Sequence, residues 1–174
     1  MKTIHTLVPF IASLAVTCAV SSSFAADAAV NSKDKSFITN AYEDGLAEVN
    51  LGNLGKGKTA HPDVKAFAEH MVTDHSKANA DLKTLADSKK VEVATEPTLV
   101  AKGKAKLLDA KSGAAFDKAF AEGMVSDHKK AVEAFEKAAN EATDPDVKAF
   151  AAKTLPTLKE HLSMAEALHD KVGK

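Results

Sequence analysis

The sequence has 174 residues, of which 45% are hydrophobic and 27% charged, and 23 basic residues nearly balance 24 acidic ones for a net charge of −1. Every basic residue is a lysine, so the guanidinium fork that binds phosphates and base edges is absent. These features argue against nucleic acid or an anionic membrane surface as a partner. The one cysteine, Cys18, rules out a disulfide framework within the chain.

Residues 1–25 have the three-part pattern of a secretory signal peptide. Lys2 supplies a positive charge, an apolar run follows, and small residues lead up to Ala25. We expect cleavage after Ala25 and a periplasmic location for residues 26–174. A lipid anchor at Cys18 is a minor alternative, because the residues before this cysteine do not match a lipoprotein signal.

The remainder of the chain is rich in Ala, Lys, Glu, Leu and Asp and poor in β-branched residues, which favours an all-α domain. Glycine and proline residues divide it into four long helical segments. We expect these helices at about residues 33–56, 62–89, 113–142 and 145–171. Ser112 is the expected cap of the third helix, and Asp144 that of the fourth.

The connection between the second and third long helices is long, and the segment after Pro97 predicts one short helix within it. Helices of roughly 25 residues are near 38 Å long. Four of them, joined by two short links and one long connection, predict a ferritin-like four-helix bundle for residues 26–174. No second apolar run reaches the roughly 18 residues that a membrane span needs, so we expect no span.

A twelve-residue run occurs twice in the chain. FAEHMVTDHSKA at residues 67–78 returns as FAEGMVSDHKKA at residues 120–131, with nine of twelve positions identical. The repeat has two readings: core packing inherited from a duplication, or two histidines that are brought to one site.

Helical spacing places one ionisable residue on the apolar stripe of each long helix. These residues are Glu48, His75, His128 and His161. Each lies within about one turn of the midpoint of its predicted helix, so in a bundle of similar-length helices the four fall at one level. Such a layer is typical of metal sites in bundle cores, and copper, zinc, iron and manganese are the candidate ions.

Two further sets of side chains accompany the histidines. A carboxylate directly precedes each one (Asp74, Asp127 and Glu160), and a methionine lies within one turn of each (Met71, Met124 and Met164). A carboxylate one position back points about 100° away from its own histidine. It could instead accept the ring N–H of a histidine on a neighbouring helix, or join the ligands. Thioethers beside imidazoles suit copper, whereas Glu48 with histidines suits zinc, iron or manganese.

A second hypothesis needs no metal. The Glu/His layer would then be hydrogen-bonded within itself and would only fix helix packing in a structural or interaction module, with a second copy or an envelope protein as partner. His61, His70 and His169 lie off the apolar stripes and are expected at the surface. We assign no catalytic residue, because the chain shows no Ser–His–Asp order, no glycine-rich phosphate loop and no cysteine after the leader.

Four segments of the sequence carry a resemblance to a known family. They are FITNAYEDGLAEVNLG, PDVKAFAEHMVTDH, FDKAFAEGMVSDH and VKAFAAKTLPTLKEHL. Over about residues 35–168 the chain resembles the bacterial domain of unknown function 4142 family, which is grouped with ferritin-like proteins. The resemblance implies an exported helical bundle, often periplasmic or lipid-anchored, without an established activity. Di-iron ferritin-like proteins use Glu-x-x-His pairs, whereas the acids here adjoin the core histidines, so we do not expect a ferroxidase centre.

Overall fold

The computed structural model describes residues 30–173, and within this range the chain forms five helices and no strand. The helices are α1 (Ser32–Lys58), α2 (Pro62–Ser88), α3 (Leu99–Asp109), α4 (Gly113–Glu141) and α5 (Pro145–Val172). The predicted all-α class is confirmed, and so are the four long helices and the short helix in the connection. The expected signal peptide and Cys18 lie outside the described residues.

The helix starts follow from local capping. Asn31 accepts hydrogen bonds from the backbone N–H groups of the first turn of α1, and Asp144 does the same for α5. Ser112 holds the expected cap position of α4, but its side chain makes no capping hydrogen bond. The next residue, Gly113, has a φ of +54°, and this left-handed turn directs the chain into α4 without the Ser112 hydroxyl.

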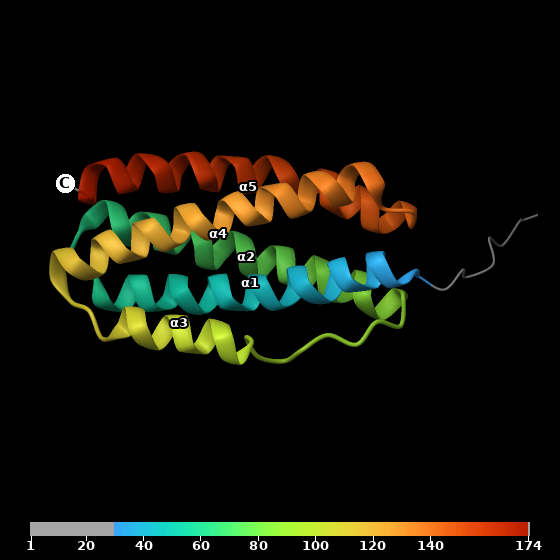
Figure 1. Cartoon of the computed structure of the whole chain (residues 1–174), viewed down its shortest axis with the longest axis horizontal. Helices are drawn as coiled ribbons and strands as arrows, with labels where there is room; N and C mark the ends of the chain where they lie inside the picture. The colour runs from blue at the N-terminus through green and yellow to red at the C-terminus, as the bar shows by residue number, and fades with distance from the viewer. Residues whose placement is uncertain (1–29, 174) are drawn as a thin grey trace, which may run out of the picture.

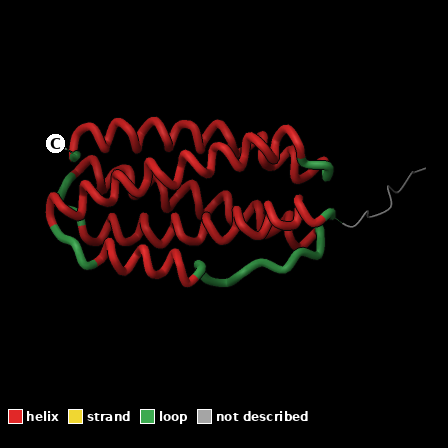
Figure 2. Tube along the Cα trace, viewed as in Figure 1, coloured by secondary structure: helices red, strands yellow, loops and turns green. Residues whose placement is uncertain are grey.

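The four long helices pack as two antiparallel pairs, α1 with α2 and α4 with α5 (Figure 1). The segment after α2 returns along the length of the molecule as a loop followed by α3 (Figure 2). This return makes α2 and α4 run in the same direction, and α3 packs on the outside against α1 and α4. Few contacts join α1 directly to α4, so the two pairs meet loosely along that seam.

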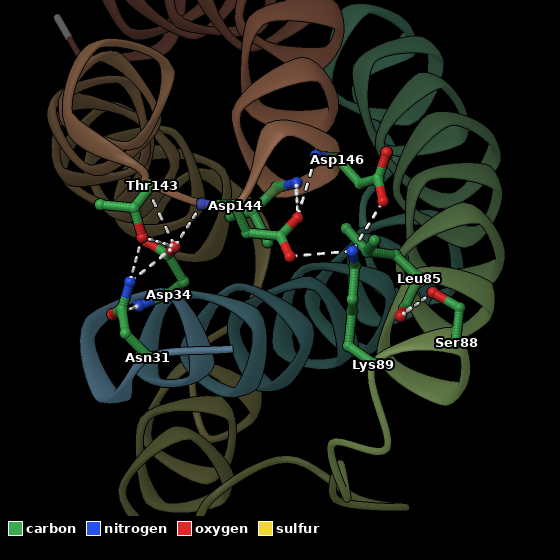
Figure 3. Close-up of polar contacts among 9 residues, drawn as sticks. Asn31, Asp34, Leu85, Ser88, Lys89, Thr143, Asp144 and Asp146 are labelled. Atoms are coloured by element: carbon green, nitrogen blue, oxygen red, sulfur yellow. Dashed lines mark hydrogen bonds and ion pairs between the residues drawn. The ribbon is translucent and has the colours of Figure 1, made fainter. Parts of the chain in front are cut away.

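Polar contacts hold one end of the bundle together (Figure 3). The Asp34 carboxylate of α1 accepts hydrogen bonds from the backbone N–H groups of Thr143 and Asp144, at 3.0 and 2.8 Å. Lys89, just after α2, forms ion pairs with Asp144 and Asp146 at 2.8 and 2.7 Å. The start of α1 and the end of α2 are therefore both tied to the turn between α4 and α5.

Most of the predicted inward stripes are buried, and helical spacing therefore identified most of the core. For α1, helical spacing predicts an inward stripe of Phe37, Ala41, Gly45, Glu48 and Gly52. Two core residues of α1, Ile38 and Leu51, fall outside this stripe. Gly45, Glu48 and Gly52 of that stripe are nevertheless buried as expected. Among the described helices, none is both long and apolar enough to cross a bilayer.

Candidate metal centre

Three buried histidines from three helices meet at the middle of the bundle. His75 comes from α2, His128 from α4 and His161 from α5, and they are 7%, 1% and 2% exposed. The ring centroids lie 5.6 Å apart for His75–His128, 5.3 Å for His75–His161 and 5.5 Å for His128–His161. One ring nitrogen of each lies within 4.8 Å of the other two, so the three could hold a metal ion.

Hydrogen bonds fix the proton position on two of the rings. The Nδ1–H of His128 donates to the carbonyl oxygen of Met124 one turn earlier, at 2.9 Å. The Nε2–H of His161 donates to Oδ2 of Asp74 on α2, at 2.9 Å. Both acceptors lack a proton to donate, so the lone pair of each ring is left on its other nitrogen. A carboxylate behind a histidine is the arrangement that orients metal-bound imidazoles.

The nitrogens that carry these lone pairs are buried and have no hydrogen-bond partner among the described residues. They are Nε2 of His128 and Nδ1 of His161. Nε2 of His75 is also buried and has no hydrogen-bond partner among the described residues. Buried polar atoms are nearly always paired in folded proteins, so three unpaired nitrogens in one place indicate an interaction with something further. One metal ion could accept a lone pair from each of the three rings.

Burial keeps the rings of His75 and His128 neutral. Removal from water lowers the pKa of His75 to about 3, and the neighbouring His128 and His161 lower it further. Burial also lowers the pKa of His128 to about 4, against the opposing effect of its hydrogen bond to Met124. At neutral pH both rings therefore carry the free lone pair that metal ligation requires.

Glu48 lies in the same cavity but outside the three-histidine group. Its side chain is buried, and its Oε2 has no partner within the described part of the chain. Burial, together with the carboxylates of Asp127 and Asp44, raises the pKa of Glu48 to about 8. At pH 7, while no cation is bound, Glu48 therefore presents a neutral carboxyl group to the cavity that the histidines also line.

The three carboxylates that precede the histidines behave differently from one another. Asp74 holds His161, as described above. Asp127 faces Lys104 and Lys130, each at 3.4 Å, and Glu160 is exposed on α5. Only the first of them therefore makes a cross-helix hydrogen bond to a ring of the layer.

The methionines pack away from the centre. Met71 and Met124 are fully buried in an apolar cluster with Phe67 and Phe120, and Met164 packs against that cluster. None of the three lines the cavity that Glu48 and the histidines share. Their positions explain the repeated Met as core packing.

One residue of the site was not singled out from the sequence. Asn79, 8% exposed, lines the cavity one turn after His75, and its Nδ2 has no hydrogen-bond partner in the described residues. The i, i+4 spacing from His75 is the signal that could have identified it. The chain also holds one Glu-x-x-His sequence, Glu166 to His169, but it lies at the surface, where His169 faces Glu122 at 3.8 Å.

A family model described as a domain of unknown function (DUF4142) matches residues 19–168. The chain belongs to the DUF4142 family. The match begins upstream of residue 35, the expected start of the resemblance. No curated protein matches this DUF4142 chain. Among solved structures it is similar to a DUF305 fragment from Deinococcus radiodurans, with a TM-score of 0.73 and 11% identity over 82% of this chain and 98% of that one. At this identity the likeness shows the fold alone.

Proposed function

We propose that this protein is an exported, ferritin-like four-helix bundle that binds one divalent transition-metal ion through His75, His128 and His161. The observation that carries the proposal is the meeting of three buried imidazoles whose free nitrogens lack a partner among the described residues. Each unpaired buried nitrogen costs about 1–3 kcal/mol, and one metal ion would remove that cost at all three. Two antiparallel helix pairs with a long connection support the bundle assignment, and the pattern of residues 1–25 supports export.

The spacing of the nitrogens suits closure around a small cation. Three nitrogens at about 2.0–2.1 Å from a tetrahedral zinc ion would lie about 3.3 Å apart. The three ring nitrogens now lie within 4.8 Å of one another, so each ring would need to move inward by less than about 1 Å. Glu48, in the same cavity, is the proposed fourth ligand, and the charge of the ion would favour loss of its proton.

The ligand set favours an ion of intermediate softness. Imidazoles with one carboxylate suit zinc, iron or manganese, and copper(II) also accepts imidazoles. Copper(I) is not favoured, because the methionine thioethers that would suit it pack in the apolar cluster and do not line the cavity. We propose metal handling in the envelope as the role, without a catalytic step.

The competing function is a structural module in which the layer only fixes helix packing. The hydrogen bonds of His128 and His161 favour it, since they hold two rings in place without any ion. The unpaired nitrogens on the inner side of the layer speak against it.

Elemental analysis of untagged protein separates the two functions. Protein purified from the periplasm should carry about one metal ion per chain, and His75→Ala and His128→Ala should abolish this metal. His70→Ala is the matched control, because His70 is exposed on the same helix as His75 and should leave the metal content unchanged.

Metal-free protein that also fails to take up added zinc, copper, iron or manganese would contradict the metal site. If such protein unfolded when either core histidine was replaced, the structural module would be favoured. Export is tested separately by the N-terminal sequence of the mature protein, which should begin at Ala26.

A further inference from the structure

The histidine layer divides the interior of the bundle into two unlike halves. On one side, Phe116, Phe120 and Met124 are at most 1% exposed, and the rings of Phe116 and Phe120 stack 5.9 Å apart. On the other side lies a cavity of about 490 Å³. The apolar residues of this second half form two separate clusters, one around Ile38 and one around Phe135.

Small side chains line this cavity where larger ones would fill it. The cavity is bordered by Ala41, Gly45, Ala78, Ala131 and Ala138. Larger apolar groups such as Leu82 and Leu158 complete the wall. The volume lies within the range of about 300–1,000 Å³ that small-molecule sites occupy.

The cavity is elongated and reaches the surface. Along α1 its lining extends from Leu51 back to Lys33, which corresponds to about 27 Å at the helical rise per residue. Exposed residues of both α1 and α4 border it, among them Asn40 and Lys137. These residues flank the seam where α1 and α4 make few contacts, so a molecule can enter between the two helix pairs.

An unpaired hydrogen-bond donor lies at the inner end of the cavity. Asn79 is 8% exposed, and its Nδ2 has no acceptor within residues 30–173. The amide is held against Gly45 of α1, where an added Cβ would come within 2.0 Å of its Oδ1. A buried N–H without an acceptor is unfavourable, so the site is suited to a ligand that supplies an oxygen.

The charges around the cavity exclude an anionic ligand. Its lining contains six acidic residues and four lysines. The lysines lie toward the surface, and two of them, Lys104 and Lys130, already face Asp127. A carboxylate at the inner end would find Asn79 but no free cation, whereas a neutral carbonyl oxygen needs only the donor.

We propose that this cavity binds a neutral, elongated and largely apolar small molecule whose terminal carbonyl oxygen accepts a hydrogen bond from Nδ2 of Asn79. The hydrocarbon body lies along the cavity between α1 and α4, against alanine, leucine and phenylalanine side chains. This binding goes beyond the metal function and needs no metal.

The test uses the fluorescent ketone Prodan, a neutral naphthalene with a propionyl group, on full-length mature protein freed of metal with a chelator. Prodan should bind with about one site per chain, and its emission should move to shorter wavelength in the apolar cavity. The alkanone 2-decanone should displace it, whereas decanoate, with the same chain length and a charged end, should compete at least tenfold more weakly. Absence of binding to the wild-type protein, or equal competition by decanoate, would overturn the proposal.

Three variants locate the bound probe. Ala131→Leu narrows the cavity and should weaken Prodan binding at least tenfold, while Ala80→Leu, on an exposed face of α2, should leave it unchanged. Asn79→Leu keeps the size of the side chain and removes the donor. It should weaken Prodan binding about fivefold to tenfold.

The apolar amine N-phenyl-1-naphthylamine has no carbonyl group and serves as the reference probe. Its affinity should be the same in the wild-type protein and in Asn79→Leu. If Asn79→Leu lost affinity for both probes equally, Asn79 would only support the fold. If the wild type and Ala131→Leu bound Prodan equally, the probe would occupy a surface site. Either result contradicts the proposal. Metal content of the same samples, measured separately, shows whether the metal site stands or fails independently of this cavity.

Discussion

The carboxylate of Asp74 on α2 accepts a 2.9 Å hydrogen bond from the Nε2–H of His161 on α5. Because the two residues are 87 positions apart, this bond joins the two helix pairs at the level of the histidine layer. It also holds the His161 ring with Nδ1 free, as the Met124 carbonyl holds His128 with Nε2 free. The rings are therefore oriented for ligation before any ion arrives.

The first prediction concerns this orientation. Asp74→Ala should lower metal affinity about 10–100-fold, the usual effect of losing the acceptor behind a ligating histidine, while the fold is kept. Competition with a chromophoric chelator measures the affinity, and circular dichroism follows the helices. Asp127→Ala is the matched control, since Asp127 precedes His128 in the same way but faces lysines. Equal losses in both variants would contradict the role of Asp74.

The second prediction is a pH optimum of stability for the metal-free protein. The pKa of His75 is about 3 and that of His128 about 4 in the folded state, against about 6.5 when unfolded. Below pH 6.5 the unfolded chain therefore binds protons that the native state does not, and the free energy of unfolding falls with falling pH. Glu48 acts in the opposite direction, because its pKa of about 8 lets the native state keep a proton that the unfolded chain loses above about pH 4.5.

Below pH 6.5 the two histidines change the free energy of unfolding more than Glu48 does, and above pH 6.5 Glu48 acts alone. We therefore expect the free energy of unfolding to be highest close to pH 6.5. Urea unfolding from pH 4 to 9 measures the profile. Glu48→Gln should remove the decline between pH 6.5 and 8, and it should make the rise between about pH 4.5 and 6.5 steeper, because Glu48 no longer opposes the two histidines there. A decline of the same slope in this variant would show that the carboxyl of Glu48 does not keep its proton in the native state.

The helices and the height of the histidine layer could be predicted from the sequence. The 3.6-residue period shows which face of each helix is buried, and the proline or glycine boundaries show how far along the bundle each residue lies. The position of Glu48 relative to the rings could not be predicted. Spacing along α1 says how far along the bundle Glu48 lies, but the separation of α1 from α4 depends on packing across a seam with few contacts. The cavity was missed for the same reason, since alanines and glycines on a stripe are compatible with both close packing and open space.

The third prediction tests the fastening of the bundle end. Asp34→Ala would leave the N–H groups of Thr143 and Asp144 without their acceptor in a partly buried turn, so it should lower the free energy of unfolding by roughly 2–4 kcal/mol. Metal content should not change, because Asp34 lies about 20 Å along α1 from Glu48. Asp87→Ala is the control, since Asp87 forms only an exposed ion pair with Lys83 and should cost at most about 1 kcal/mol. A loss no greater than the control's would mean that this turn is held by other contacts.

The fourth prediction uses three glycines of α1 to compare the two halves of the bundle. A Cβ at Gly55, in the close-packed half, would come within 2.9 Å of the Phe120 ring and 3.0 Å of the Cβ of Ala68. Both neighbours are fully buried, so Gly55→Ala should destabilise the protein by about 1–3 kcal/mol. A Cβ at Gly57 meets nothing within 4 Å, and Gly57→Ala should stabilise it by about 0.5–1 kcal/mol through helix propensity.

Gly45→Ala tests whether the half of the bundle that contains the cavity is closely packed or open. Its Cβ would come within 2.0 Å of the Asn79 amide, yet that amide borders the cavity and can swing into it. The gain in helix propensity then offsets most of the strain, and the expected change in stability is within about 1 kcal/mol of zero. Prodan binding should be lost, because the displaced amide occupies the inner end of the cavity. A cost at Gly45 as large as that at Gly55, measured by urea unfolding, would mean that this half of the bundle is as closely packed as the other.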